Sequence, residues 1–444
     1  MTALTILHAN QEKDAPNIAA IRRNLSLAPL LLAGLSTGKA DDTTSAVLRI
    51  IAAVQEHGDQ ALVEFTRQFD HASLSPKQLR VSSEQIQQAV RTARPEFMAA
   101  LDHAIENVRR YQKAMLPPEP TEIRPVSGGD GSRLAVRYQP LGRVGVYVPG
   151  GAGAYPSSVV MTVVPAQVAG VRSIVICSPM RNGMVAPAVL VAAQRLGIDE
   201  IYALGGAQAI AAMAIGTLSI RKVDKIVGPG NSYVQVAKKE LFGVVDIDSF
   251  AGPSEVIVLA DDSASPRMVA AELLAQAEHA PGSCLLITES GELAKKVQAE
   301  VDGQLTELSR RDLTIKALQY ASAIIVTPDH NAALDMVNDF APEHLQITTR
   351  DSRADAEKII NAGGIFIGPH TPVAVGDYIA GPSHVLPTSG TARFFSGLSA
   401  ESFRKRISLV EYDAAALEKV ADAIDVLATT EGFDAHARSV RIRR

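Results

Sequence analysis

The chain has little cysteine and no excess of positive charge, and both absences narrow its function. Its 444 residues include two cysteines, Cys177 and Cys284, each inside an apolar run typical of a strand. Two such thiols fit reduced core residues and exclude a disulfide framework or a cysteine zinc cage. Lysine and arginine number 43 against 48 aspartates and glutamates, a formal net charge of −5. No general basic field is therefore present to attract nucleic acid or an anionic membrane.

Long apolar runs are also missing. No run approaches the ~20 residues that a membrane span needs. Residues 1–17 carry no basic segment followed by a long apolar core, which is the pattern of a secretory leader. The composition, 47% hydrophobic and 20% charged, is ordinary for a globular protein. We therefore expect a cytoplasmic protein of two or three domains that binds neither nucleic acid nor membrane.

Strand and helix patterns alternate over most of the chain. One series runs from Arg143 to about Asp248, and a second from Val256 to Gly368. Alternating βα units predict parallel sheets covered by helices on both faces. The expected fold is α/β, with two doubly wound, incomplete Rossmann-like domains and helical N-terminal and C-terminal extensions. The expected divisions are a helical arm (1–40), the helical part of the first domain (41–142), an α/β domain (143–250), a second α/β domain (251–398) and a tail (399–444).

Glycine loops follow three strands of the first series. They lie at residues 149–153, 205–206 and 228–231. Because parallel sheets bind ligands at the carboxyl ends of their strands, these loops predict a nucleotide site. None of them is a G-x-G-x-x-G fingerprint, and no acidic residue stands at the offset that would bind a ribose. The pattern alone leaves structural turns as an equal alternative.

The segment from Asp248 to His279 joins a glycine loop, a strand and a helix that ends in possible metal ligands. Ser265 followed by Pro266 predicts the start of the helix. At about 100° per residue, Gln276 and His279 lie one turn apart on one face, whereas Glu278 points about 100° away and receives no metal role. Such a pair can supply half of a metal's ligands. The alternative is a last-turn histidine favoured by the helix dipole beside a solvated glutamine.

Further polar residues concentrate downstream. Glu343 and His344 are adjacent in the turn APEHLQI, and we expect their side chains to diverge and to serve two atoms of one substrate. Their alternative role is a proline-initiated turn with solvated charges. Four more candidates are Asp377, His384, Glu431 and His436, and they could equally be loop hydrogen bonders or part of a frayed tail.

Five separated motifs resemble the histidinol dehydrogenase family. They are AGPSE, LLAQAEH, APEHL, GDYIAGPSHVLPTSGTARFFSGLS and EGFDAHA, in this order. The resemblance runs from about Arg143 to His436, is looser before Arg143, and finds no signature in residues 1–40. Ala280 stands where a glycine is common in the family, and this change should be harmless.

The resemblance implies an enzyme that oxidises L-histidinol through L-histidinal to L-histidine, the last step of histidine biosynthesis. It implies two NAD used in turn, one zinc ion per subunit, and a homodimer with shared active sites in which the tail enters the partner's site. It places the acid and base on Glu343 and His344. The implied zinc ligands are Gln276, His279, Asp377 and His436; these four and His344 would also contact substrate, together with Ser254, His384 and Glu431. The implied NAD contacts are Tyr147, Gln208 and Asn231.

Three other functions stay open at this level. Cys284 could attack an aldehyde to give a thiohemiacetal, as in aldehyde dehydrogenases. The same scaffold could oxidise another polar alcohol, although Glu343, His344, Glu431 and His436 together favour histidinol. A protein that senses NAD or zinc without catalysis would need no acid and base pair.

Overall fold

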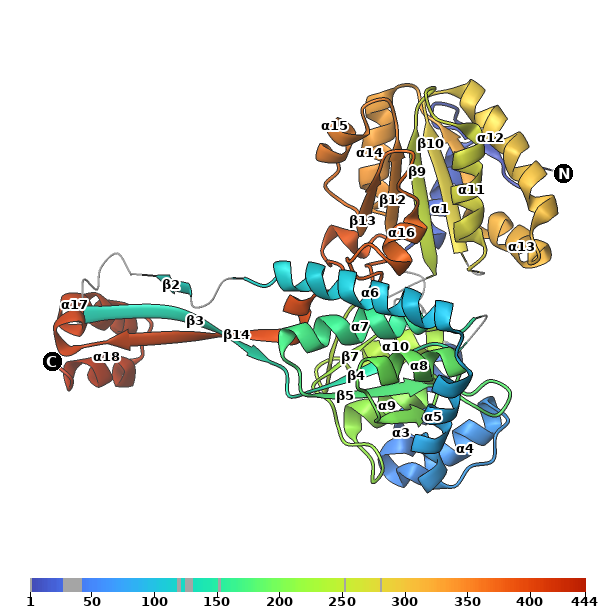
Figure 1. Cartoon of the computed structure of the whole chain (residues 1–444). Coiled ribbons are helices and arrows are strands. Elements are labelled where there is room, and N and C mark those ends of the chain that lie inside the picture. Colours follow the sequence, from blue (N-terminus) through green and yellow to red (C-terminus); the bar gives the residue numbers. More distant parts are fainter. Residues whose placement is uncertain are drawn as a thin grey trace.

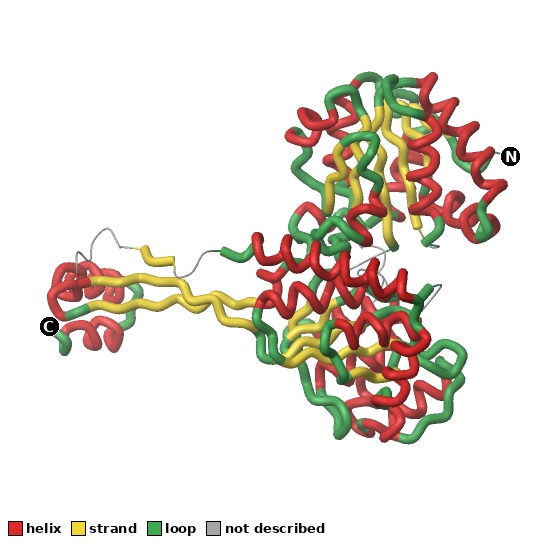
Figure 2. Tube along the Cα trace, in the orientation of Figure 1, coloured by secondary structure: helices red, strands yellow, loops and turns green. Residues whose placement is uncertain are grey.

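The protein consists of two parallel sheets, each with its own helices, and a projecting arm (Figure 1). Its computed structural model describes residues 2–26, 42–117, 121–123, 131–150, 153–250, 253–279 and 282–444. Parts of three expected features lie outside the described residues, namely the N-terminal arm (27–41), the glycine loops (151–152 and 251–252) and the end of the ligand-bearing helix (280–281). Figure 2 shows helices on both sides of each sheet, and the expectation of an α/β fold is confirmed.

The first sheet has five parallel strands in the order β6-β5-β4-β7-β8. The strands are β4 (Arg143–Tyr147), β5 (Ser173–Ser178), β6 (Ile201–Ala203), β7 (Lys225–Val227) and β8 (Asp246–Ile247). The chain starts in the middle at β4, winds to one edge and then returns to wind to the other. This reversal between β4 and β7 is the place where doubly wound sheets bind ligands, beyond the carboxyl ends of the strands.

Helices cover both faces of the first sheet because its strands are apolar on both sides. Val144 and Val146 face one core, while Tyr147, Val175 and Cys177 face the other. The first core is covered by α5 (Ser83–Thr92), α6 (Pro95–Ala114), α7 (Pro156–Ala169) and α8 (Pro187–Arg195). The second is covered by α3 (Asp42–His57), α4 (Asp59–Phe69), α9 (Gly206–Ile215) and α10 (Ser232–Leu241).

The second sheet is parallel throughout, with the order β1-β11-β10-β9-β12-β13. The strands are β1 (Ile6–His8), β9 (Ser254–Ala260), β10 (Gly282–Thr288), β11 (Ala323–Val326), β12 (His344–Thr348) and β13 (Gly364–Ile367). Apart from β1, the order repeats that of the first sheet. The expectation of two similar halves therefore matches the topology.

Central strand β9 shows why this sheet is covered on both faces. Val256 and Val258 face one core, and Ile257 and Leu259 face the other. The first core is covered by α11 (Pro266–Ala277), α12 (Gly291–Gln304) and α13 (Arg311–Ala321). The second is covered by α1 (Ala15–Asn24) and α14 (His330–Phe340). Two shorter helices, α15 (Ser352–Glu357) and α16 (Val373–Tyr378), flank β12 and β13 (Figure 1).

The N-terminal segment belongs to the second sheet. We expected a helical arm over 1–40, and α1 is indeed helical, but β1 forms an edge strand with Ile6 opposite Ile324. The strand is only three residues long, so periodicity within it carried no signal. Figure 1 shows the N-terminus on the domain formed by residues 253–398, which lie far from the N-terminus along the chain.

A three-stranded antiparallel sheet carries the C-terminal helices away from both domains (Figure 1). Strand β3 (Ser132–Pro140) pairs antiparallel with β14 (Arg404–Tyr412), and β2 (Thr121–Ile123) pairs with β3. Helices α17 (Ala414–Thr430) and α18 (Asp434–Arg441) pack on each other at its end. The tail expected as helical thus contains a long strand, β14, before its two α-helices. We call β2, β3, β14, α17 and α18 the arm.

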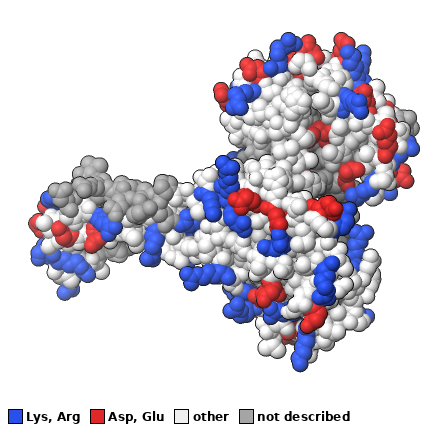
Figure 3. All heavy atoms as spheres, viewed as in Figure 1, with Lys and Arg blue, Asp and Glu red and all other residues white. Residues whose placement is uncertain are grey.

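Short 3₁₀ helices among the described residues are η1 (Pro76–Leu79), η3 (Leu305–Glu307), η4 (Thr391–Arg393) and η5 (Ala400–Phe403). Within the same residues, no helix has both the length and the apolar character that crossing a membrane requires. Figure 3 shows acidic and basic side chains interspersed over the visible face of both domains.

Candidate active site

The amino ends of β9 and β12 bring together polar residues that are 89 residues apart in sequence. Ser254 Oγ donates a hydrogen bond to Glu343 Oε2 at 2.7 Å, and the Glu255 amide donates to the same oxygen at 3.1 Å. His344 Nδ1 lies 3.4 Å from this oxygen. The two adjacent side chains therefore meet, whereas we expected them to diverge. The second domain places these groups at the amino edge of its sheet.

The imidazole of His344 has a defined orientation. Its Nδ1 lies 3.0 Å from the carbonyl oxygen of Glu255, which can only accept, so Nδ1 carries a hydrogen and Nε2 is free to exchange a proton. Nε2 is buried, has no hydrogen-bond partner among the described residues, and lies 3.7 Å from Asp377 Oδ1. Burial lowers the pKa of His344, but the charges of Glu343 and Asp377 outweigh burial and raise it to about 9.

Gln276 and His279 lie at the carboxyl end of α11. Gln276 Nε2 donates to Ser254 Oγ at 2.7 Å, which leaves its Oε1 outside this hydrogen bond. The helix ends at Ala277, so His279 lies in the turn that follows, with its amide on the Gln276 carbonyl at 3.2 Å. We expected His279 inside the helix. Burial lowers the pKa of His279, which favours the neutral imidazole that a metal requires.

Asp377 reaches the same place from α16. Glu272 on α11 accepts a hydrogen bond from the Val373 amide at 2.8 Å, so a buried carboxyl group joins the helix before His279 to the helix that carries Asp377. Burial raises the pKa of Asp377, but His344, His384 and His279 outweigh it and lower this pKa. Glu272 was not predicted, although it lies on the same helical stripe as Gln276.

His384 connects the site to the first domain. Its Nδ1 lies 3.0 Å from the Asp377 carbonyl oxygen, and its Nε2 lies 3.4 Å from Ser158 Oγ at the start of α7. Further contacts between the domains are hydrogen bonds from Asn107 Nδ2 to the Ile379 carbonyl and from Ser383 Oγ to the Met161 carbonyl, both 2.9 Å. The candidate site thus lies between the two α/β domains. Ser158 carried no signal in the sequence.

Glu431 and His436 are remote from these residues within one chain. Both are exposed at the end of the arm, where α17 and α18 lie far from α11 and α16 (Figure 1). The described residues contain no group of three or more His, Cys, Asp and Glu side chains placed to hold a metal. Of the four expected ligands, one is a glutamine and one lies on the arm. Within a single chain, His279 is hydrogen-bonded through its amide to the Gln276 carbonyl and is near enough to Asp377 to lower its pKa.

The three expected NAD residues follow strands of the first sheet at their carboxyl ends. Tyr147 ends β4, and its hydroxyl accepts from the Gly206 amide at 3.0 Å. Gln208 lies in the first turn of α9, where its Oε1 is buried and has no hydrogen-bond partner among the described residues. Asn231 caps α10 through a 3.1 Å hydrogen bond from the Val234 amide to its Oδ1.

A buried ion pair shapes the loop before Asn231. Lys238 Nζ pairs with Asp248 and donates to the Gly228 carbonyl at 2.9 Å, while the Gly228 amide donates to Asp248 Oδ2 at 2.7 Å. Gly228 has a φ of +115°, and a Cβ there would collide with the Tyr147 carbonyl. Only glycine lets the loop pass so close to the end of β4.

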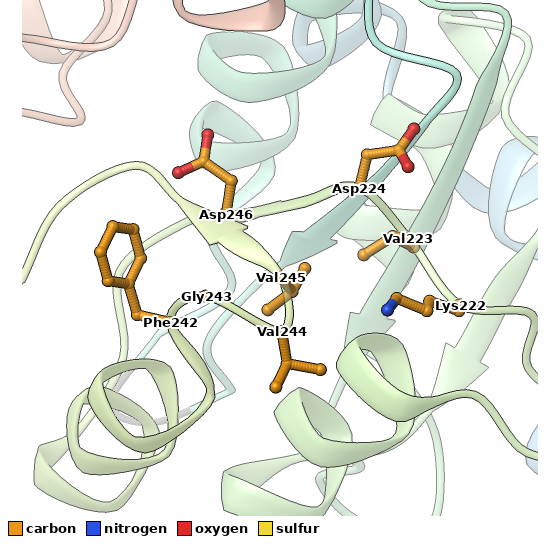
Figure 4. Close-up of a pocket in the computed structure, with 8 residues that line it drawn as sticks. All are labelled: Lys222, Val223, Asp224, Phe242, Gly243, Val244, Val245 and Asp246. Atoms are coloured by element: carbon orange, nitrogen blue, oxygen red, sulfur yellow. The ribbon is translucent and has the colours of Figure 1, made fainter. Parts of the chain in front are cut away.

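An open pocket of about 430 Å³ lies elsewhere, beside the edge strand β8 (Figure 4). Its lining includes Asp224 and Asp246, whose carboxylates point away from Val244. Asp224 accepts from the Gly142 and Arg143 amides, and Asp246 pairs with Lys225 at 2.9 Å. Both acids already have partners, so the pocket contributes nothing to the candidate site.

The environment of Cys284 does not suit a catalytic nucleophile. Its side chain is 0% exposed within β10, and burial raises its pKa to about 12. Reactive cysteines need the thiolate and access to substrate, and this thiol has neither. Both cysteines are free and buried.

A substitution at Gly363 tests how closely the position of Glu343 must be maintained. A Cβ added at Gly363 would lie 2.6 Å from the Glu343 carbonyl oxygen, so Gly363→Ala should displace Glu343. Because a misplacement of about 1 Å can cost roughly 10²-fold in rate, we expect kcat to fall by about that factor. Gly303→Ala is the matched control, since an added Cβ there meets no atom within 4 Å. Steady-state kinetics that find equal kcat for the two variants would contradict the prediction.

Comparisons with known proteins show the family of this chain. A family model described as histidinol dehydrogenase matches residues 35–444. The histidinol dehydrogenase of Synechococcus sp. is 50% identical over 402 residues, covering 90% of this chain and 92% of that protein, and that of Heliobacterium mobile is 46% identical over 399 residues, covering 89% and 92%. The crystal structure of histidinol dehydrogenase from Elizabethkingia anophelis has a TM-score of 0.91 at 33% identity, covering 100% of this chain and 98% of that one. The chain therefore belongs to the histidinol dehydrogenase family.

Proposed function

We propose that this oxidoreductase converts L-histidinol to L-histidine through L-histidinal, with NAD as the hydride acceptor in both steps. The observation that carries the proposal is the cluster between the two domains in which the Ser254 hydroxyl donates to Glu343 and the His344 ring lies 3.4 Å from the same carboxylate oxygen. It supplies two groups that exchange protons, and the two oxidation steps require proton removal from an alcohol and from a water molecule. Membership of the family supports the choice of substrate.

His344 is the proposed base of the first step. As the carbinol is oxidised, its hydroxyl proton passes to Nε2, because Nδ1 is held by the Glu255 carbonyl. The raised pKa of His344 comes in part from Asp377. A cation held by Asp377 would neutralise that charge and bring the pKa of His344 back towards neutral, where an imidazole is an effective base.

Glu343 is the proposed base of the second step. It takes a proton from water, and the resulting hydroxide adds to the aldehyde carbon to give a gem-diolate that is oxidised to the acid. Burial raises the pKa of Glu343, which makes its carboxylate a stronger base than an exposed one. The Ser254 hydroxyl, hydrogen-bonded to both Glu343 and Gln276, orients the carboxylate and is a proposed substrate contact.

The donor atoms of Gln276, His279 and Asp377 fit one zinc ion per subunit. They offer an amide oxygen, a neutral imidazole and a carboxylate, all of which zinc accepts. His436 is the proposed fourth ligand. What zinc supplies when bound is an anchor for the imidazole and amino nitrogens of the substrate. His384, His344 and Glu431 are the other proposed substrate contacts.

NAD is proposed to bind at the carboxyl edge of the first sheet, which supplies Tyr147, Gln208 and Asn231. The buried, unpartnered Oε1 of Gln208 and the glycine loop at Gly228 support this placement. Gly228 follows β7 beside the reversal of the winding, and Gln208 follows the edge strand β6, where the Gly206 amide reaches the Tyr147 hydroxyl. The nicotinamide would then approach the site from the side of the first domain.

A homodimer completes the proposal. The arm of one chain ends in exposed residues that include Glu431, His436 and Phe433, whereas the remaining candidate residues cluster between the domains. We infer that the arm of each chain inserts into the site of its partner, so that two sites form only in the dimer.

The direct test follows NADH absorbance with L-histidinol and NAD. We expect two NADH per L-histidinol, loss of activity with a chelator, and its return when zinc is added back. An amino alcohol without the imidazole is the matched substrate control, and it should react far more slowly. NADH formation at the same rate with and without the chelator would contradict the proposed role of zinc. Absence of NADH with zinc-loaded protein would reject the proposed reaction.

A further inference from the structure

Glu255 is a second buried carboxyl group beside Glu343, and the proposed reaction gives it no role. Its main chain contacts both members of the acid and base pair, because its amide donates to Glu343 Oε2 at 3.1 Å and its carbonyl accepts from His344 Nδ1 at 3.0 Å. Its side-chain Oε1 accepts from the Glu343 amide at 3.2 Å and from the Ser389 amide at 2.8 Å. One residue therefore holds the backbone of Glu343 and the side chains of Glu343 and His344.

The environment of the Glu255 side chain disfavours a charge. The residue is 3% exposed, and its Oε2 is buried with no hydrogen-bond partner among the described residues. A buried carboxylate without full pairing is costly, and a second carboxylate nearby makes it costlier. Burial, the unpartnered Oε2 and the charge of Glu343 all favour the protonated form of the Glu255 carboxyl group.

The contacts decide which of the two carries the negative charge. Glu343 receives the Ser254 hydroxyl and the Glu255 amide, and lies 3.4 Å from the His344 ring. Glu255 receives only amides through Oε1. Burial, and then the charge of Glu343, raise the pKa of Glu255 to about 8, against smaller opposing effects of the Ser389 amide, the Glu343 amide and the His344 ring. Glu343 and His344 both lie at the start of β12, and the charge of Asp377 on α16 raises the pKa of each of them.

We propose that Glu255 is a positioning residue that works as an uncharged carboxylic acid. Its main chain orients Glu343 and His344, and its buried proton keeps the one negative charge of the two carboxyl groups on Glu343. This inference rests on the proposed roles of Glu343 and His344. It adds a residue that contacts neither substrate nor cofactor and acts through that pair.

The kinetic test compares Glu255→Ala with Glu255→Gln. Alanine removes the acceptor that holds the Glu343 backbone, so kcat should fall by up to roughly 10²-fold, as for a misplaced catalytic group, with little change in KM. Glutamine is uncharged, has the same shape and keeps the Oε1 acceptor, so it should recover most of that loss. If Glu255→Gln is as slow as Glu255→Ala, the uncharged form is not the working form and the proposal fails. Unchanged kcat in both variants would also overturn it.

A stability test needs no substrate and stays informative if Glu255→Ala does not fold. A glutamate with a pKa near 4.3 when unfolded and about 8 when folded binds more protons in the native state between these values, so wild-type stability falls over this window as pH rises. Glu255→Gln lacks this loss. The difference between its midpoint of thermal unfolding and that of the wild type should therefore increase from pH 5 to 8 and stay constant above pH 8.

The two tests also separate this inference from the proposed function. Glu357→Gln, on the exposed face of α15, removes a carboxylate without burial and should show no such pH-dependent gain. If the stability difference between Glu255→Gln and wild type does not change between pH 5 and 8, Glu255 is ionised in the folded protein and the inference fails, whatever the enzyme does. If Glu343→Gln and His344→Gln both keep full turnover, the proposed function fails while the stability result stands.

Discussion

Glu343→Gln is expected to lower the rate of L-histidine formation by roughly 10² to 10⁴, the usual contribution of a general base. Glutamine can still accept the hydrogen bonds from Ser254 and the Glu255 amide, so the site should keep its geometry. What it loses is the proposed acceptor of the proton from water. The rate of the second oxidation should therefore fall the most. Rapid mixing should show NADH from the first step followed by slow turnover.

Glu357→Gln is the control for this variant, because it removes the same charge from the surface of the same domain. It should leave kcat unchanged. L-histidinal supplied directly should be oxidised as slowly by Glu343→Gln as the aldehyde formed in the site. Wild-type turnover of L-histidinal by this variant would show that another group activates the water.

Mixing two inactive chains should restore activity if the arm completes the partner's site. Gln276→Ala damages the half of the site between the domains, and His436→Ala damages the half on the arm. In a random mixture half of the dimers are mixed, and each of these has one intact site, so activity should recover to about a quarter of the wild-type value. The expected rise from almost no activity is as large as the loss expected from any of the single substitutions.

A second mixture provides the control. Gln276→Ala and His279→Ala both damage the half between the domains, so their mixture should stay inactive. Native mass spectrometry of chains that differ in mass would verify that mixed dimers form in each case. Mixed dimers of Gln276→Ala and His436→Ala without recovered activity would show that each site is built from one chain.

Local pattern predicted much of the fold. The apolar run Val256–Leu259 is a buried strand, and Ser265-Pro266 starts the helix that leads to Gln276. Ser82 and Gln85 form a capping box at the start of α5, as the Ser-x-x-Gln spacing predicts. The repeated strand order of the two sheets follows from the alternating βα units seen in the sequence. These features depend on residues close together in the chain, whose spacing and capping act locally.

Other features could not be read from local pattern. His279 was expected inside a helix, but the helix ends at Ala277 and the turn is closed by the Gln276 carbonyl. Residues Ile6–His8 were expected as part of a helical arm, but they pair with β11, more than 300 residues away. A three-residue strand buries too little to show a period of its own, so its partner decides its structure.

The sequence by itself determined the layered α/β architecture, the reduced cysteines of the core and the identity of the candidate polar residues, because composition, periodicity and motifs are properties of contiguous residues. Only the tertiary structure decided that the amino ends of β9 and β12 meet, that Ser158 reaches His384 from the other domain, and that Glu255 is enclosed beside Glu343. Long-range strand pairing creates that enclosure. Burial in turn sets the charge of each carboxyl group, so the chemistry of Glu255 and Glu343 belongs to the fold.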